Sequence, residues 1–407
     1  MMSRPLSHVR VLDLSRVLAG PWASQNLADL GAEVIKIERP GSGDDTRSWG
    51  PPWLKNRDGA ETREAAYYLS VNRGKKSVTL DISRPEGQEI ARRLARESDV
   101  VLENFKVGTL ARYGLGYEDI RKINPNIVYC SITGFGQSGP YSSRPGYDFI
   151  FQGMGGLMSI TGERDDLPGG GPQKVGIAIT DVLTGMYAAL AITAAIAHRQ
   201  AGGAGQYIDL ALLDTLVAFN ANQLLAFWCS GEIPRRWGNA HPNIAPYEVF
   251  PTSDGHIILA VGNDGQFSSF CRVAGRPELV RDARFRTNPD RVRNRDELVP
   301  IVRDIMKTRS KQDWIAALEA AGVPCGPINN MKEVFEDPQV QHRGIRVDIS
   351  HPDGVVPTPA NPIRYSETPI TYEVPPPLLG QHTSEILGGL LGISEQELDA
   401  LKARGVI

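Results

Sequence analysis

The acidic residue best placed to do chemistry is Asp181, within the sequence TDVLTG at residues 180–185. It opens an almost wholly apolar stretch that predicts a helix as far as about Arg199. One interpretation is a helix cap, in which the carboxylate accepts backbone N–H bonds worth about 1 kcal/mol. The other is a nucleophile: the helix N-terminus keeps the carboxylate ionised in apolar surroundings, and a poorly solvated carboxylate attacks activated acyl groups.

Basic residues follow several predicted strand ends or lie in the adjoining loops. They are Arg16, Arg39, Arg47, Arg73, Lys75, Lys76 and Arg112. An arginine offers a planar fork of donors that matches phosphate oxygens, so cations that converge above a sheet would clamp several phosphates. Each of them also fits an ordinary solvated surface charge, and the sequence leaves both interpretations open.

Other familiar kinds of site have little support. The seven histidines show no HExxH spacing, no Gly-x-Ser-x-Gly elbow is present, and the four cysteines lack the close spacing of a zinc site. A strand–turn–helix–strand unit ending in Glu38 imitates a dinucleotide site, but its turn, SRVLAGP at residues 15–21, lacks the spaced glycines. We therefore expect no metal and no permanently bound cofactor.

Composition narrows the class of protein. The 407 residues suffice for two domains of ordinary size. Because 44 Lys and Arg residues nearly balance 47 Asp and Glu residues, for a net charge of −3, nucleic acid is not an expected partner. No signal-like segment opens the chain, and its longest apolar stretch, 186–197, is shorter than the ~20 residues that cross a bilayer. We expect a buried helix there, no membrane association and a cytoplasmic location.

The elements that must position these residues follow an α/β pattern. Continuous apolar runs predict strands at residues 9–14, 33–38, 77–82, 99–103 and 126–133, with helices at 22–30 and 84–98. A capping box of Ser83 and Glu86 is expected to start the second helix. This alternation predicts a parallel sheet covered on both faces, and such sheets bind ligands at the carboxyl ends of their strands, where Arg16 lies.

Beyond residue 133 the pattern changes. Residues 134–175 are rich in Gly, Pro and Ser and predict a mobile loop system. Further helices are expected at 181–199 and 212–228, with a strand at 206–210. Turn residues at 231–246 indicate a linker. The following segments predict a strand at 256–261, helices at 264–273 and 311–321, and a terminal helix near 395–403.

Four stretches together carry a resemblance to a known family. They are VLDLSRVLAGP at 11–21, AEVIKIER at 32–39, ENF at 103–105 and TDVLTG at 180–185. On these the chain resembles, over essentially its full length, the class III CoA-transferase family, which includes the formyl-CoA transferase and carnitine CoA-transferase types. GDDTR at 43–47, YYLSVNR at 67–73, GPINNMK at 326–332 and PPPLLGQHT at 375–383 look like its succinyl-CoA:glutarate (hydroxymethylglutarate) branch.

The resemblance implies an enzyme that moves CoA from an acyl-CoA, here succinyl-CoA, to a free dicarboxylic acid such as glutarate. Asp181 matches the nucleophile of the family, which reacts through an aspartyl anhydride and an aspartyl-CoA thioester. Coenzyme A is thus a substrate. The contacts to it fall on Arg16, Val17, Leu18, Arg39, Lys75, Asn104, Phe105 and Arg112.

The family fold implies a large Rossmann-like domain with a parallel sheet, a smaller α+β domain, and two chains interlocked as a homodimer. On this chain we expect the large domain at residues 1–215 and a linker at 216–245. The small domain is expected at 246–328, followed by a C-terminal segment at 329–407 that returns to the large domain.

Two departures from the family's patterns bear on the substrate. Formyl-type members carry a run of glycines where this chain has GNAHPN at 238–243, which disfavours formate or oxalate and makes His241 a candidate for the acyl pocket. The related α-methylacyl-CoA racemases have Gly-His-Asp where this chain has Gly146-Tyr147-Asp148. Without that histidine, two-base proton transfer at the α-carbon lacks one partner. Racemisation or epimerisation is the alternative function, and Tyr147 is a candidate substrate contact.

Overall fold

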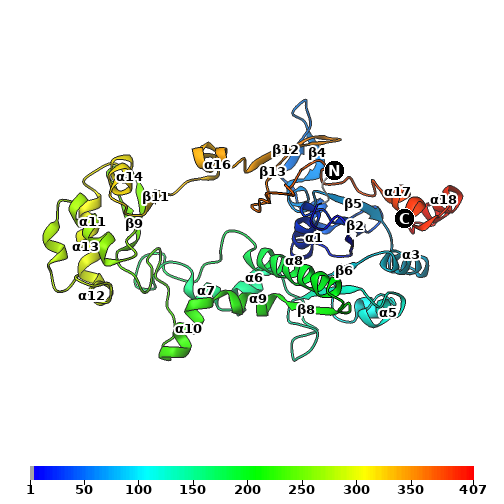
Figure 1. Ribbon diagram of the computed structural model, residues 1–407, viewed down its shortest axis with the longest axis horizontal. Coiled ribbons are helices and arrows are strands. Elements are labelled where there is room, and N and C mark those ends of the chain that lie inside the picture. Colours follow the sequence, from blue (N-terminus) through cyan, green and yellow to red (C-terminus); the bar gives the residue numbers. More distant parts are fainter. Residues whose placement is uncertain (1–3) are drawn as a thin grey trace. The chain divides into compact units, whose positions relative to one another are not determined.

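A computed structural model describes residues 4–407, which form two compact units (Figure 1). Unit 1 comprises the described residues up to Leu157, Val175–Leu225 and Gln341–Ile407, and unit 2 comprises Met158–Lys174 and Ala226–Val340. These boundaries differ from the predicted division. Residues 158–174 and 329–340 belong to unit 2, and the expected linker is shared between the units rather than separate from both.

Unit 1 is built on a six-stranded sheet in which every adjacent pair of strands is parallel. Across the sheet the strands are β5 (Lys75–Thr79), β2 (Glu33–Glu38), β1 (Arg10–Asp13), β6 (Val100–Glu103), β7 (Val128–Thr133) and β8 (Tyr207–Ala211). Numbered along the chain, this order is 3-2-1-4-5-6, that of a doubly wound Rossmann-type sheet. The predicted α/β class is confirmed. Because the order reverses between β1 and β6, the loops after these two strands diverge and open a crevice.

One face of the sheet carries the main core of unit 1. Leu12, Ile35, Val78 and Val101 pack there against apolar side chains from four helices. These are α3 (Pro85–Arg96), α5 (Tyr117–Ile123), α17 (Thr383–Leu391) and α18 (Glu395–Ala403). α17 and α18 come after unit 2 in the sequence. The C-terminal segment therefore supplies part of the core of unit 1.

The other face is covered by α1 (Ala19–Asp29) and α8 (Ile179–Gln200), which pack against each other. Among the described residues, α8 alone is long and apolar enough, by length and composition, to cross a membrane, and 39% of its most apolar window is buried. The expectation of a buried helix at 186–197 is therefore only partly right. Met186, Tyr187 and Leu190 are at least 42% exposed, because only one side of α8 faces the sheet and α1.

Three local predictions are corrected. Ser83 does not cap α3, because its hydroxyl donates to Asp81 Oδ1 at 2.6 Å instead. The region expected to be loop contains two short helices, α6 (Asp148–Met154) and α7 (Leu157–Ile160). The single helix expected at 212–228 is two, α9 (Leu212–Phe219) and α10 (Ala221–Ser230), separated where Ala221 adopts a φ of 41°.

Shorter elements complete unit 1. They are η1 (Asp45–Ser48), β3 (Trp53–Lys55), β4 (Glu61–Ala65), α2 (Ala66–Leu69), α4 (Thr109–Arg112), β12 (Arg346–His351) and β13 (Gly354–Pro359). The last two strands form an antiparallel pair, as do β3 and β4. α16 (Pro338–His342) leads into this segment.

Unit 2 has its own antiparallel sheet and core. Its strands are β9 (Tyr247–Pro251), β10 (His256–Ala260) and β11 (Cys325–Pro327), in the order β11-β10-β9. Its helices are α11 (Asp264–Val273), η2 (Pro277–Val280), α12 (Asn288–Arg293), α13 (Arg295–Met306), α14 (Lys311–Ala320) and α15 (Met331–Glu336). Phe250, Phe267, Phe270 and Trp314 are at most 1% exposed and form the centre of this core.

We predict that Gly185→Ala destabilises the protein although alanine favours helices. A Cβ at residue 185 would lie 2.5 Å from the carbonyl oxygen of Ala19 and 3.0 Å from the Trp22 ring, so α1 and α8 must separate. Overpacking of this kind costs about 1–3 kcal/mol. The matched control is Gly389→Ala in α17, where the added Cβ meets nothing within 4 Å and gains up to ~1 kcal/mol of helix propensity. Thermal unfolding should separate the two variants; equal melting temperatures would contradict this packing.

Candidate functional site

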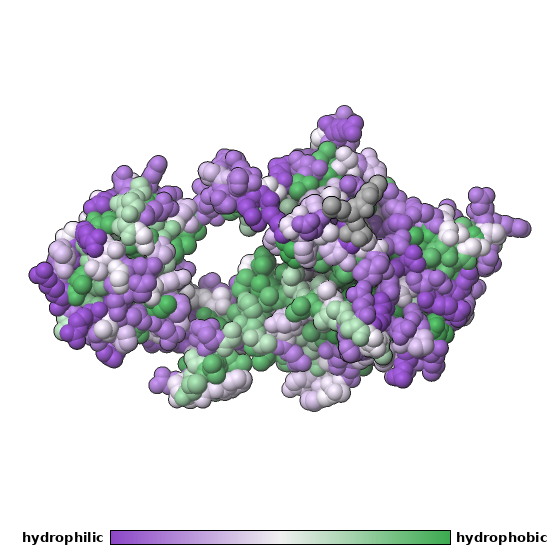
Figure 2. All heavy atoms as spheres, viewed as in Figure 1, coloured by the Kyte–Doolittle hydropathy of each residue, from purple (hydrophilic) through white to green (hydrophobic). Residues whose placement is uncertain are grey.

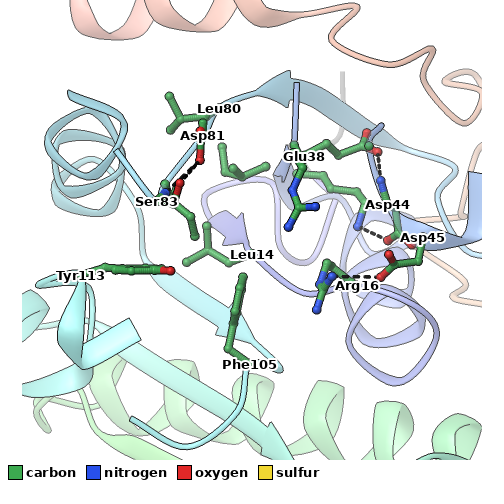
Figure 3. A pocket seen from close by; sticks show the side chains of 15 residues that line it. Leu14, Arg16, Glu38, Asp44, Asp45, Leu80, Asp81, Ser83, Phe105 and Tyr113 are labelled. Carbon is green, nitrogen blue, oxygen red and sulfur yellow. Dashed lines mark hydrogen bonds and ion pairs between the residues drawn. The ribbon is translucent and has the colours of Figure 1, made fainter. Parts of the chain in front are cut away.

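Two pockets open at the carboxyl edge of the sheet, at the loops that follow β1 and β6. Pocket A has a cavity volume of about 260 Å³ and is lined in part by Arg16, Arg39, Asp44, Phe105 and Tyr113. In Figure 3, Phe105 and Tyr113 lie on one side of this pocket, and Arg16 with Asp45 on the other. Pocket B, of about 210 Å³, shares Arg16, Asp45 and Phe105 with pocket A. It is further lined by Val17, Leu18, Asn104, Tyr147 and Asp181.

The structure thus gathers most of the predicted contacts at the switch point of the sheet. Asn104 holds the loop after β1, because its side-chain amide accepts the Arg16 N–H at 2.9 Å and donates to the Arg16 carbonyl at 2.7 Å. The Arg16 guanidinium pairs with Asp45 at 3.0 Å and lies 5.5 Å from the centre of the Phe105 ring. Arg39 is exposed in pocket A, and its guanidinium has no hydrogen bond or ion pair to any residue in 4–407. Its cationic charge is available to a ligand.

Two predicted contacts lie elsewhere. Lys75 is completely buried, and its ammonium donates to the Pro21 carbonyl and to Asn72 Oδ1, each at 2.9 Å. Burial lowers the pKa of Lys75 to about 7. Since no surface of this side chain is accessible, the expectation that it contacts a ligand is wrong for this conformation. Arg112 is exposed at the end of α4 and lines neither pocket, whereas its neighbour Tyr113 lines pocket A.

Asp181 is the third residue of α8, and it does not cap that helix. Asp148 performs the capping from the start of α6: its Oδ1 accepts the Thr180 N–H at 2.7 Å and the Asp181 N–H at 3.3 Å. Gln152 fixes Asp148 by donating to Oδ2 at 2.6 Å, while its own Oε1 accepts the Val175 N–H at 2.8 Å. The Asp181 carboxylate therefore has no hydrogen-bond partner within residues 4–407, so the capping interpretation is wrong.

The environment of Asp181 disfavours its charge. Burial, and then the negative charge of Asp148, raise the pKa of Asp181 to about 7. Burial and the charge of Asp148 therefore oppose the ionisation that was expected from the helix N-terminus. Near neutral pH a substantial fraction is nevertheless deprotonated, and a poorly solvated carboxylate can act as a nucleophile toward an activated acyl group.

Sequence reasoning missed two residues of this site. Asp148 was read only as part of a motif, and its capping role became visible because it lies against a helix that begins 31 residues later. The second is Tyr67, whose pKa is raised to about 12 by burial and by the nearby charges of Asp181 and Asp148. It stays a protonated donor at neutral pH. The motif YYLSVNR at 67–73, which begins with Tyr67, was the feature of the sequence that could have pointed to this residue.

The two candidate acyl-pocket residues lie in different units. Tyr147 is 66% exposed and lines pocket B together with Asp181. His241 belongs to unit 2, where its carbonyl accepts a bond from Arg295 and its Nδ1 accepts the Asn243 N–H at 3.1 Å. Burial and the charge of Arg295 lower the pKa of His241, so the ring is neutral at pH 7. In the described part of the chain no three His, Cys, Asp or Glu residues form a group suited to a metal ion.

Comparison with known proteins decides the family. The model of CoA-transferase family III matches residues 6–383. The chain belongs to this family. A succinate–glutarate CoA-transferase of Agrobacterium fabrum is 53% identical to it over 387 residues, covering 95% of this chain and 96% of that protein. The human succinyl-CoA:glutarate CoA-transferase is 45% identical over 405 residues, covering 99% and 90%.

The fold agrees with this assignment. The crystal structure of a CaiB/BaiF family protein from Brucella suis matches this class III CoA-transferase with a TM-score of 0.84 and 47% identity, covering 96% of this chain and all of that one. The resemblance seen in the sequence motifs is confirmed, and the protein is a CoA-transferase.

We predict that Asp148→Asn shifts the pH profile of this CoA-transferase to lower pH. With the deprotonated form of Asp181 as the expected nucleophile, kcat/KM of the wild type should rise with pH around a midpoint near 7. Asparagine keeps an oxygen that can cap Thr180 but removes the negative charge that raises the pKa of Asp181. The midpoint should therefore fall. The melting temperature should fall as well, because an amide NH2 replaces the oxygen that accepts the Gln152 N–H at 2.6 Å. An unchanged or higher midpoint would show that Asp148 does not control Asp181.

Proposed function

We propose that this CoA-transferase moves CoA from succinyl-CoA to glutarate or a closely similar dicarboxylate, with Asp181 as the nucleophile. The observation that carries the proposal is the Asp181 carboxylate, which is desolvated, free of hydrogen-bond partners and exposed to pocket B beside the Arg16 turn. The names of the relatives from Agrobacterium fabrum and human support the choice of donor and acceptor.

The reaction consists of two matching halves. Asp181 attacks the thioester carbonyl of succinyl-CoA, the C–S bond breaks, and an aspartyl anhydride and CoA thiolate form. The thiolate attacks the aspartyl carbonyl, which releases succinate and leaves an aspartyl-CoA thioester. Glutarate then attacks this thioester to form a second anhydride, and the thiolate attacks the glutaryl carbonyl, giving glutaryl-CoA and free Asp181. One thioester replaces another, so catalysis depends on positioning and on excluding water from the anhydrides.

The two pockets suit the two ends of CoA. Pocket A offers the unpaired Arg39 and the aromatic rings of Phe105 and Tyr113 to a nucleotide with its phosphates. The exposed pair of Arg16 with Asp45 is worth at most about 1 kcal/mol, so a phosphate can displace Asp45. Binding energy from this end is then available at the thioester in pocket B. Val17, Leu18 and Asn104 complete the proposed CoA contacts, and Tyr147 and His241 are proposed acyl contacts.

The test is to replace the nucleophile. Asp181→Ala should lower exchange between succinyl-CoA and glutarate at least about 10³-fold, because no carboxylate remains to be acylated. Coenzyme A should still bind within several-fold of the wild type. Asp214→Asn is the matched control, since Asp214 is likewise the third residue of its helix, α9, but is exposed. Exchange is followed by mass spectrometry of the acyl-CoA products.

Two outcomes would contradict the assignment. Full exchange activity in Asp181→Ala would show that another group is acylated. Solvent deuterium at the α-carbon of a branched acyl-CoA, without any acyl exchange, would point instead to a racemase.

We also propose that two copies of the chain form an interlocked homodimer. In unit 1, large apolar side chains stay exposed along α6, α8 and α9, among them Phe149 at 56%, Leu190 at 65% and Phe219 at 43%. Figure 2 shows apolar residues gathered over α8 and α9. A patch of this size is typical of a surface that a partner covers. The exposed free thiol of Cys229 supports a reducing location such as the cytoplasm.

Interlocking predicts a specific behaviour in solution. Dimers of tagged and untagged chains, mixed under native conditions, should not exchange subunits, because linked rings separate only when a chain unfolds. Mixed dimers should form after unfolding and refolding, as detected by native mass spectrometry. A monomer of 44.4 kDa, or exchange without unfolding, would contradict the proposal.

A further inference from the structure

The turn that shapes both pockets contains a strained residue. Val17 has a φ of 71°, in the left-handed region that β-branched residues rarely adopt. Ala221 is the other non-glycine residue with positive φ among those described. Such a conformation costs about 1–2 kcal/mol and persists only where the surroundings impose it.

A buried ion pair lies beneath the turn and binds its backbone. Asp44 accepts the Val17 N–H, with both carboxylate oxygens 3.3 Å from the nitrogen. Lys36 pairs with Asp44 at 2.9 Å and also donates to the Ser15 carbonyl at 2.8 Å. The pair therefore binds the Ser15 carbonyl and the Val17 N–H, which lie on either side of Arg16 in the chain. Both side chains of the pair are 0% exposed.

The charge of the pair is maintained inside the protein. Burial opposes ionisation of Asp44, but the Lys36 charge and hydrogen bonds from Thr46 prevail and lower its pKa to about 2. Burial likewise opposes the charge of Lys36, yet Asp44, Asp13 and Glu38 together raise its pKa. Both groups are thus charged throughout the physiological pH range. We therefore expect their hydrogen bonds to the turn not to change with pH in that range.

Stability alone does not account for this pair. Replacing a buried ion pair with apolar residues of similar volume is often neutral or stabilising, because each charge loses its hydration. In contrast, the pair contacts the turn whose partly buried residues Arg16 and Val17 line pocket B. We propose that Lys36 and Asp44 are positioning residues that hold Val17 in the left-handed conformation and thereby preorganise the turn for CoA. This inference rests on the proposed function, in which that turn binds CoA.

The chain supplies a matched control. Arg73 and Asp29 form a second buried ion pair of unit 1, with 5% and 4% exposure of the side chains and a distance of 2.7 Å. Arg73 also donates a hydrogen bond to Thr358 and so links the C-terminal segment to α1. Neither Arg73 nor Asp29 contacts residues 15–17 or lines pocket A or B. Removing either pair takes away two buried charges, but only the first pair touches residues 15–17. Lys36 and Asp44 also line pocket A, so the rescue by Val17→Gly described below separates positioning of the turn from a change in the pocket wall.

The experiment compares Lys36→Met/Asp44→Leu with Arg73→Met/Asp29→Leu. Thermal unfolding measures stability, and calorimetry measures the Kd of free CoA. We expect the first variant to bind CoA about tenfold more weakly and the control to stay within about twofold, as the loss of preorganisation implies. At saturating succinyl-CoA the kcat of the first variant should change less than its KM, since Asp181 is untouched.

Rescue distinguishes positioning from a general structural role. Adding Val17→Gly to Lys36→Met/Asp44→Leu should restore much of the CoA affinity, because glycine adopts positive φ without strain. If the double variant does not fold, Lys36→Met/Asp44→Asn and Lys36→Met/Asp44→Ala carry the same test without leaving a buried charge unpaired. Asparagine keeps an acceptor oxygen for the Val17 N–H and alanine does not, so the variant with alanine should have the higher Kd.

The possible failures are distinct. If the wild type does not bind CoA, the proposed function fails. If the wild type binds CoA and the variants at Lys36 and Asp44 bind it equally well, the function stands and the positioning role is overturned. Weakening of the Arg73/Asp29 control to the same degree would also overturn it.

Discussion

The chemistry proposed for this CoA-transferase depends on one carboxyl group, that of Asp181, which lacks both water and hydrogen-bond partners among residues 4–407. The start of a helix normally satisfies an acidic residue in its first turn. Here Asp148 takes the N–H groups of Thr180 and Asp181, so that the Asp181 carboxylate receives neither their hydrogen bonds nor much solvent. Its pKa near 7 is the measure of that deprivation, and it marks a group whose anion gains by forming a covalent bond.

The fold places this group beside the loops that can hold a long substrate. The switch between β1 and β6 separates the loop carrying Arg16 from the loop carrying Asn104 and Phe105, and Asn104 links the two loops again through the Arg16 backbone. The close approach of α1 and α8, which Gly185 allows, aligns the first turn of α8 with the same edge of the sheet. Pockets A and B thus meet at the turn that contains Arg16.

Much of this arrangement could be predicted from the sequence, because it follows from local patterns. Continuous apolar runs located the central strands, and the predicted strand at 33–38 and helix at 264–273 have the observed bounds. The family motifs placed Asp181, Arg16 and Asn104 in one site. In each of these cases the prediction uses only residues that are close together in the sequence.

The errors arose where a partner lies far along the chain. Asp148 could not be recognised as the cap of a helix that begins 31 residues later, nor Asp81 as the competitor that takes the Ser83 hydroxyl away from α3. Lys75 looks like a solvated cation within RGKK, yet it stands on a strand and turns toward Asn72 and the Pro21 carbonyl. A cation's sequence neighbours do not reveal which face of a sheet it occupies.

The covalent intermediate can be observed directly. The enzyme is incubated with succinyl-CoA, quenched with hydroxylamine or borohydride, digested and mapped by mass spectrometry. Acylation of the desolvated carboxyl predicts a hydroxamate, or the corresponding reduced side chain, on the peptide that contains Asp181. Modification of a different residue, with position 181 left unchanged, would contradict the account.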